Sequence, residues 1–251
     1  MEKIKVSSDG AVRQVTLARG EKRNALDAEM LEALTEAFAR GPGEHERVTV
    51  IRAEGPVFCA GLDLRERGGG TIGSAAIETM LHAIETYSLP VVAVVHGDAI
   101  AGGNELALHC DFVVASETAR FGMSLAKIGL APSWFLAKKL LEVAGPVGAR
   151  EMLLLGDLLP APRMAEMGLI HRAVPAEDLE ATAQSVIGRL AANAPLSLKA
   201  MKAVLVRAMA FRDGVVHADV DALVAAASQS ADAREGIAAM LERRAPRFEG
   251  R

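Results

Sequence analysis

Two glycine-rich turns carry the residues of this chain that are best suited to chemistry. Residues 58–64 read FCAGLDL, and residues 96–106 read HGDAIAGGNEL. Each turn follows a β-rich run, and the second also opens a predicted helix. Backbone N–H groups at a helix N-terminus lack partners, and glycine lets a ligand approach them closely, so such turns can bind an anion. Taken singly, each turn is better explained as a tight connection, because glycine-rich turns are common.

Glu105 is the carboxylate of the second turn and falls in the first turn of the helix predicted at residues 103–110. A carboxylate there is stabilised by the helix dipole, which is a purely structural role. The same side chain could also act as a general acid or base beside the free N–H groups. The residue alone favours the structural role.

A set of short motifs along the chain, in family order and at family spacing, resembles the crotonase (enoyl-CoA hydratase/isomerase) family. Each motif is weak alone, but together they cover nearly the whole sequence. The motifs are RNAL at 23–26, AGLD at 60–63, GGNELA at 102–107, CD at 110–111, FG at 121–122, KIGLAP at 127–132 and ERRAPRF at 242–248.

The resemblance implies a mechanism in which a thioester carbonyl oxygen is held between two backbone N–H groups. By motif position these groups belong to Leu62 and Gly102, and Glu105 matches one of two catalytic glutamates. Negative charge develops on that oxygen when the α-carbon becomes carbanion-like, and one preorganised donor contributes about 3–4 kcal/mol in comparable oxyanion holes. The substrate implied is an acyl-coenzyme A, as in fatty acid metabolism, with coenzyme A as part of the substrate and no separate cofactor.

The sequence departs from the hydratases at the second glutamate, where it carries Leu125. Other members place an aspartate after the later proline, and here that residue is Ser133. Hydration needs one group to activate water and another to protonate the α-carbon, and losing one costs about 100- to 10,000-fold. We therefore expect weak hydration of ordinary short-chain substrates, and favour isomerisation or an unusual substrate. Four neighbouring side chains could substitute, although structural roles are favoured for them: Glu78, His82, Asp98 and Ser124.

The resemblance also implies which residues bind the acyl-coenzyme A. Arg243 matches a basic position that reaches the ribose 3′-phosphate, often on a neighbouring subunit, although a solvated helix end explains it equally well. The remaining residues follow the pantetheine, adenine and acyl path: Arg23, Ala25, Ala60, Leu62, Asp63, Leu64, Gly102 and Leu125.

Hydrophobic patterning predicts the elements that position these residues. Alternation predicts a hairpin at 4–17, and strands follow at 48–52, 91–95 and 111–115. Helices are predicted after the N-cap Asp27 and at 75–87, with a flexible break at 68–70 between them. This order predicts an α/β fold with a mostly parallel sheet. Only Ala-rich helices follow residue 195, at 197–209, 213–228 and 232–244.

The family fold implied is a spiral of ββα units followed by a C-terminal helical trimerisation region. We accordingly divide the chain into an α/β core, residues 1–195, and a helical region, residues 196–251. The resemblance implies a homotrimer or a dimer of trimers.

Composition narrows the class of protein further. The net charge of −4 argues against a nucleic-acid partner bound through bulk positive charge. Cys59 and Cys110 are too few for a disulfide framework and are expected to be free. The N-terminus shows no signal-peptide core, and the longest apolar run, 89–95, is too short for a bilayer. We expect no membrane association, a cytoplasmic location, and no metal site, because no His/Cys cluster has ligand spacing.

Other enzyme classes fit the sequence poorly. No GxGxxG follows the first strand, residues 122–126 fail the GxSxG pattern, and Gly103-Asn104 replaces the serine of crotonase-fold peptidases. A hydrolase or decarboxylase of the same family stays open, since an oxyanion hole serves any such anion. A catalytically weak member that only binds acyl-coenzyme A is the main alternative outside enzymes.

Overall fold

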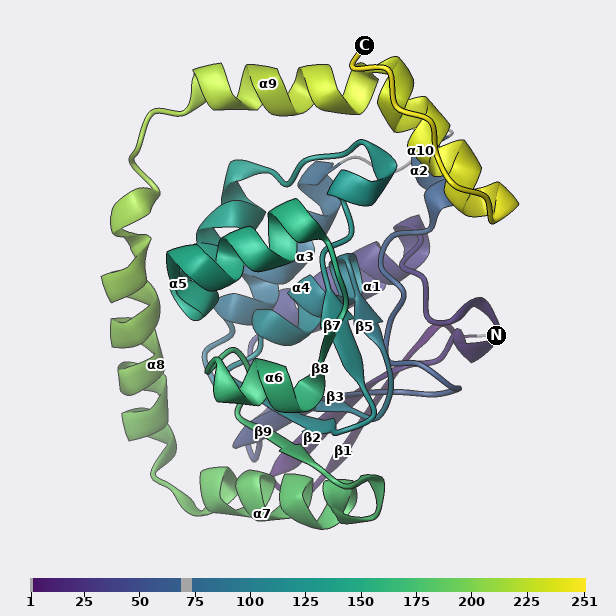
Figure 1. Ribbon diagram of the computed structural model, residues 1–251. Coiled ribbons are helices and arrows are strands. Elements are labelled where there is room, and N and C mark those ends of the chain that lie inside the picture. Colours follow the sequence, from purple (N-terminus) through teal and green to yellow (C-terminus); the bar gives the residue numbers. More distant parts are fainter. Residues whose placement is uncertain (1, 69–73) are drawn as a thin grey trace.

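A twisted sheet of six strands forms one wall of the molecule (Figure 1). The computed structural model describes residues 2–68 and 74–251. Strands β1 and β2 pair antiparallel as the predicted hairpin, and every later neighbour pair of this sheet is parallel. The strands, in spatial order, are β1 (Ile4–Asp9), β2 (Val12–Leu17), β3 (Val48–Ala53), β4 (Val91–Val95), β6 (Phe112–Ser116) and β9 (Arg172–Val174).

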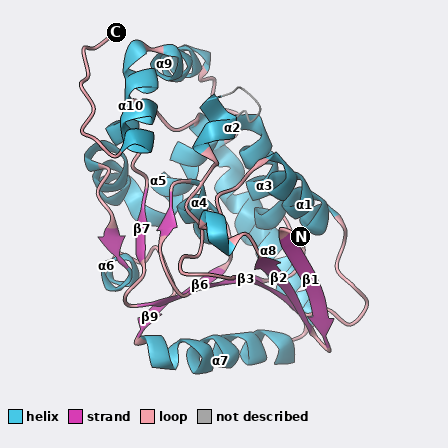
Figure 2. Cartoon of the chain, turned by 90° about the vertical axis from the view of Figure 1, so that its right-hand side faces the viewer, coloured by secondary structure: helices cyan, strands magenta, loops and turns pink. Residues whose placement is uncertain are grey.

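Helices cover both faces of this sheet, which explains its unbroken apolar strands. All five residues of β4 are buried, as its β-branched sequence predicts. One face packs Val92 and Val94 against helix α7 (Leu179–Ala192), which lies below the sheet in Figure 2. The other face belongs to the main core under α1 (Ala28–Ala39) and α3 (Ser74–Glu85).

A second sheet holds the three short strands β5 (Ala99–Ile100), β7 (Arg120–Gly122) and β8 (Leu159–Pro160). The sequence analysis predicted none of them, because two or three residues are too few for a recognisable alternation. Strand β5 runs directly into helix α4 (Gly102–Leu108), so this small sheet fixes where α4 begins.

Most predicted helices are confirmed, with some shifted ends. Asp27 caps α1, and its carboxylate accepts a hydrogen bond from the Met30 N–H at 3.0 Å. The prediction that a helix begins at 213 is wrong, because a turn through Gly214 delays α9 (Ala218–Gln229). Of the predicted break at 68–70, residues 69 and 70 lie outside the described residues. The remaining helices are α2 (Leu64–Gly68), α5 (Trp134–Arg150), α6 (Ala161–Glu166), α8 (Pro195–Met209) and α10 (Ala231–Glu242).

The last three helices frame the rest of the chain (Figure 1). Helix α8 runs along one side, α9 crosses the top, and α10 returns to pack on the short 3-10 helix η2 (Ala126–Ile128). Gly236 makes this packing possible, because a Cβ there would lie 2.4 Å from the Ile128 carbonyl carbon. No helix in the described part of the chain is long and apolar enough to cross a membrane. Both cysteines are buried and free, as expected.

Candidate active site

The two glycine-rich turns lie against each other in the structure. Isolated β-bridges join Leu26 to Leu62 and Cys59 to Ala99, which aligns the first turn with strand β5. A Cβ built on Gly102 would lie 3.5 Å from the Leu62 nitrogen. Neither the Leu62 nor the Gly102 N–H donates to a backbone carbonyl within the described residues. Two unpaired amides, predicted from distant motifs, are therefore neighbours.

The start of helix α4 is held in an unusual backbone conformation. Ala101 is the N-cap and has φ 48° and ψ −115°, which a side chain rarely adopts. Its N–H donates to the Gly122 carbonyl at 2.8 Å, which ties the turn to β7. The next residue but one is Gly103, and a Cβ at this position would lie 2.2 Å from the Cys59 carbonyl oxygen. The close approach of the two turns thus requires glycine at this position.

Glu105 lies one turn into α4, with no exposed surface. Its N–H donates to the Ala101 carbonyl at 3.0 Å, but neither carboxyl oxygen has a hydrogen-bond partner among the described residues. Burial raises the pKa of Glu105 to about 8, and the positive charge of Lys139 lowers it in part. The carboxyl group is therefore mostly protonated at pH 7, and it can take or give a proton near neutral pH.

A cavity of about 100 Å³ connects these features. Among the described residues that line it, Glu105 is the single ionisable one, and Ser124 and Ser133 supply the hydroxyl groups. Leu125, at the position where the resemblance leads one to expect a second glutamate, also lines the cavity and contributes no carboxylate there. The other lining residues are Ala60, Leu62, Leu64, Ile77, Ile100, Ala101, Gly102, Met123, Ile128, Ala131, Leu136 and Met240.

Three of the four suggested substitutes for that glutamate lie elsewhere. Asp98 is paired with the Arg120 guanidinium, with 3.0 Å between its Oδ1 and Arg120 Nε. Glu78 and His82 line a different cavity, beside α8. Only Ser124 of the four reaches the cavity that holds Glu105.

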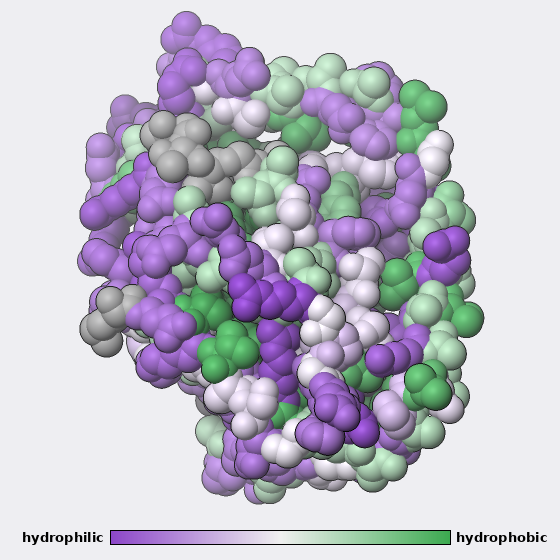
Figure 3. All heavy atoms as spheres, turned by 180° about the vertical axis from the view of Figure 1, so that it is seen from behind, coloured by the Kyte–Doolittle hydropathy of each residue, from purple (hydrophilic) through white to green (hydrophobic). Residues whose placement is uncertain are grey.

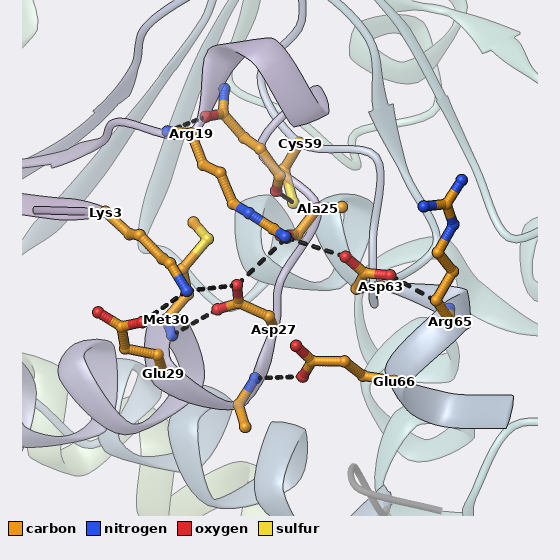
Figure 4. A network of polar contacts seen from close by, with 12 residues as sticks. Lys3, Arg19, Ala25, Asp27, Glu29, Met30, Cys59, Asp63, Arg65 and Glu66 are labelled. Carbon is orange, nitrogen blue, oxygen red and sulfur yellow. Dashed lines mark hydrogen bonds and ion pairs between the residues drawn. The ribbon is translucent and has the colours of Figure 1, made fainter. Parts of the chain in front are cut away.

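A polar network around Arg19 holds the first glycine-rich turn, residues 58–64, in place (Figure 4). The Arg19 guanidinium donates to the Ala25 carbonyl at 2.7 Å and to Asp63 Oδ2 at 3.0 Å, and it lies 3.3 Å from Asp27 Oδ2. Asp63 is therefore engaged within the protein rather than directed at the cavity. Arg19 was not predicted from the sequence, because it belongs to none of the motifs and only its contacts show that it organises this turn.

Asn24 is a second organising residue that the sequence analysis did not single out, although it lies within the RNAL motif. It is fully buried, and its amide nitrogen donates to the carbonyls of Glu54 at 2.7 Å and Val57 at 3.0 Å. Its side-chain oxygen accepts from the Arg19 N–H at 2.9 Å. A buried polar residue with all of these bonds fixes the loop that carries Ala25 and Leu26.

The remaining predicted coenzyme A residues lie outside the cavity lining. Arg23 is exposed and has φ 56°, and its carbonyl accepts from the Ala60 N–H at 3.0 Å. Ala25 is half-buried beside it. Arg243 is exposed at the end of α10, three residues after Met240, which does line the cavity. No group of three His, Cys, Asp or Glu side chains in the described part of the chain could hold a metal ion.

Two amides beside a buried carboxyl group define a protein suited to acyl transfer or enolate chemistry. A family model described as enoyl-CoA hydratase/isomerase matches residues 7–251. The chain belongs to this family, the crotonases, and is an acyl-coenzyme A-processing enzyme with the crotonase α/β fold.

Several characterised relatives share its full length. The chain is 33% identical over 248 residues to (E)-benzylidenesuccinyl-CoA hydratase of Thauera aromatica, covering 95% of this chain and 96% of that protein. It is 31% identical over 257 residues to 2,3-dehydroadipyl-CoA hydratase of Escherichia coli, covering all of both chains. The crystal structure of an enoyl-CoA hydratase from Mycobacterium avium subsp. paratuberculosis superposes with a TM-score of 0.86 at 28% identity, covering 99% of each chain.

Proposed function

We propose that this enzyme holds the thioester oxygen of an acyl-coenzyme A between the N–H groups of Leu62 and Gly102 and moves a proton with Glu105. The observation that supports this most directly is one cavity lined by all three residues, in which Glu105 is the single ionisable side chain among those described. The amides stabilise the enolate oxygen, and the buried carboxyl group exchanges the proton at carbon.

Double-bond isomerisation fits a single carboxyl group best. As a carboxylate, Glu105 takes a proton from C2 of a 3-enoyl thioester, which gives the enolate. The protonated Glu105 then returns that proton to C4, which leaves the conjugated 2-enoyl product and restores the carboxylate. Ordinary hydration needs a second acid or base, and Leu125 cannot supply one. We therefore expect hydration to be weak, or restricted to unusual substrates.

For the isomerisation, the acyl group of the substrate should be uncharged. The cavity walls are apolar, and they present no Lys or Arg among the described lining residues. A carboxylate on the acyl chain would lose its hydration without gaining a cation in return. In this respect we expect the chain to differ from the two relatives named for dicarboxylic substrates.

Decarboxylation within the family is the second candidate, since the buried Glu105 is mostly neutral at pH 7. A neutral acid can protonate the enolate that remains after carbon dioxide leaves. The pH dependence separates the two reactions. Isomerisation starts from the carboxylate, so its rate should rise as the pH approaches 8, whereas decarboxylation should slow as the pH passes 8.

We also propose that the enzyme assembles as a homotrimer or a dimer of trimers. Large apolar side chains lie exposed along α8 and the segment after it, and Figure 3 shows apolar residues on the edge that α8 occupies. Large apolar side chains that lie exposed together on one helix are typical of a protein interface. They include Leu196, Met201, Val204, Leu205 and Phe211.

The activity is tested by incubating the pure protein with crotonyl-CoA and, separately, with a 3-enoyl-CoA, while following the ultraviolet band of the conjugated thioester. Growth of the band from the 3-enoyl substrate is expected. The Glu105→Gln variant should lower this rate by about 100- to 10,000-fold, because the amide cannot carry the proton.

Fast loss of the band from crotonyl-CoA, abolished in Glu105→Gln, would instead make the protein a hydratase and refute the single-carboxyl argument. If neither substrate reacts although acyl-coenzyme A still binds, the isomerase proposal fails. The alternatives are then decarboxylation, thioester hydrolysis or a binding role.

A further inference from the structure

Behind Glu105, on the side away from the substrate cavity, lies a buried imidazole. His109 follows Glu105 by one helical turn and has 2% of its surface exposed. Its Nδ1 lies 2.8 Å from the Glu105 carbonyl oxygen, so this nitrogen carries the proton and donates it. The same Nδ1 lies 3.8 Å from Glu105 Oε2. The ring stacks on Phe135 of α5, with 5.3 Å between the ring centroids.

A charged cluster lies beyond this imidazole. Lys139 follows Phe135 by one turn on α5, and its Nζ lies 2.8 Å from Glu85 Oε1 on α3 and 4.0 Å from Glu142 Oε2 on its own helix. The side chains of Lys139 and Glu85 are only 15% and 16% exposed, so water screens their charges weakly.

A second cavity, separate from the one that holds Glu105, borders His109. The rear cavity, of about 560 Å³, is lined by His109, Glu85, Lys139 and Glu142, with α8 on its far side. Glu105 lines the substrate cavity and not the rear one, whereas His109 lines the rear cavity and not the substrate one. His109 is therefore the residue that contacts Glu105 and also borders the cavity that the ion pair lines.

We propose that Lys139, held in place by Glu85, is a positioning residue that stabilises the carboxylate form of Glu105 from behind the site. This inference rests on the proposed role of Glu105 as a base and extends it to a residue that touches no substrate. A cation close to a carboxyl group in a weakly screened region favours its charged form.

The charges that face Glu105 support this assignment. On its own helix, burial and then Lys139 lower the pKa of His109 to about 4, so the imidazole is neutral and contributes no charge. From α5, burial raises the pKa of Glu142 above its usual value. From α3, Glu85 keeps a pKa below its usual value, because burial, the largest single effect, is exceeded by the combined effect of nearby basic groups, of which Lys139 is the first. Lys139 is the cation that opposes the effect of burial on Glu105.

The test measures the protonation of Glu105 directly. The infrared band of its protonated carboxyl group is obtained by subtracting the Glu105→Gln spectrum, and is followed from pH 5 to pH 10. In Lys139→Met the midpoint of this titration should rise by about one pH unit. Lys139→Arg should restore it. The matched control is Lys138→Met, which removes a cation one residue away that is paired with Asp213.

Lys139→Gln removes the cation but keeps a side chain that can donate to Glu85, and it gives the same readout if Lys139→Met does not fold. Isomerase activity at pH 7 should fall about tenfold in Lys139→Met, recover at higher pH and leave KM unchanged, because a one-unit shift changes the carboxylate fraction tenfold. A midpoint unchanged by Lys139→Met and by Lys139→Gln, or raised equally by Lys138→Met, overturns the inference. A shifted midpoint without isomerase activity in any form supports the inference and refutes the proposed function.

Discussion

At the scale of single residues, Glu105 is an unfavourable side chain for the stability of this protein. A buried carboxyl group without hydrogen-bond partners loses its hydration and gains no replacement, which is costly in a folded protein. The surrounding residues could satisfy such a group if stability alone were selected. A buried, unpartnered carboxyl group beside two free amides is instead what proton transfer to a bound substrate requires.

Replacing Glu105 with glutamine should therefore flatten the dependence of stability on pH. The pKa of Glu105 rises from 4.5 to about 8 on folding, so the native state binds more protons than the unfolded chain between these values. Its contribution to stability is complete below pH 4.5 and is lost as the pH rises towards 8, by at most about 1.4 kcal/mol per pH unit. The Glu105→Gln variant has no carboxyl group at this position, so this fall in stability with rising pH is absent.

Urea unfolding at pH 5, 6, 7 and 8 measures the effect. The variant should gain stability relative to the wild type as the pH rises. Parallel curves for the two proteins would show that Glu105 is not held neutral in the folded state.

At the scale of elements, the sequence predicts segments that carry a clear local pattern and misses strands of two or three residues. The buried strand β4 and the Asp27 cap of α1 were predicted because a β-branched run and a capping residue act locally. Strands β5, β7 and β8 were not predicted, because two or three residues are too few to show an alternation. The late start of α9 was not predicted, because helix propensity does not show where a turn through Gly214 interrupts the chain.

Helix α10 offers a test of how one element shapes the cavity. Its Met240 lines the cavity that holds Glu105, and Gly236 lets the helix approach η2. Gly236→Ala should force α10 away, because the added methyl group would meet Ile128 backbone that cannot move aside. We expect KM for the acyl-coenzyme A to rise several-fold, and proteolysis before α10 to become faster.

Gly188→Ala on α7 is the matched control, since a Cβ there meets nothing within 4 Å. It should stabilise the protein by about 0.5–1 kcal/mol, because alanine loses less conformational entropy in a helix. If Gly236→Ala behaves like Gly188→Ala, then α10 does not form a wall of the site.

At the scale of the whole molecule, the site is assembled from segments that are distant in sequence. The family motifs predicted that Leu62, Gly102 and Glu105 act together, and the structure places them around one cavity. Nothing in the sequence predicted that Met240, far along the chain, would join them. Nor did it identify Arg19 and Asn24, because buried polar networks depend on the tertiary contacts that satisfy them.

The exposed side of α8 carries the last prediction. Leu205 and Val204 are 68% and 66% exposed, an unfavourable arrangement for an isolated chain in water. If copies of the chain bury this side against each other, a charge there should prevent assembly, because it would lose its hydration without a partner.

Light scattering coupled to gel filtration should give the wild type a mass of three or six chains of 26.4 kDa each. Leu205→Glu should shift it towards a single chain, whereas Ser185→Glu, on the exposed side of α7, should not. A wild-type protein that elutes as one chain, or a Leu205→Glu variant that keeps the wild-type mass, would mean that α8 is not the assembly surface.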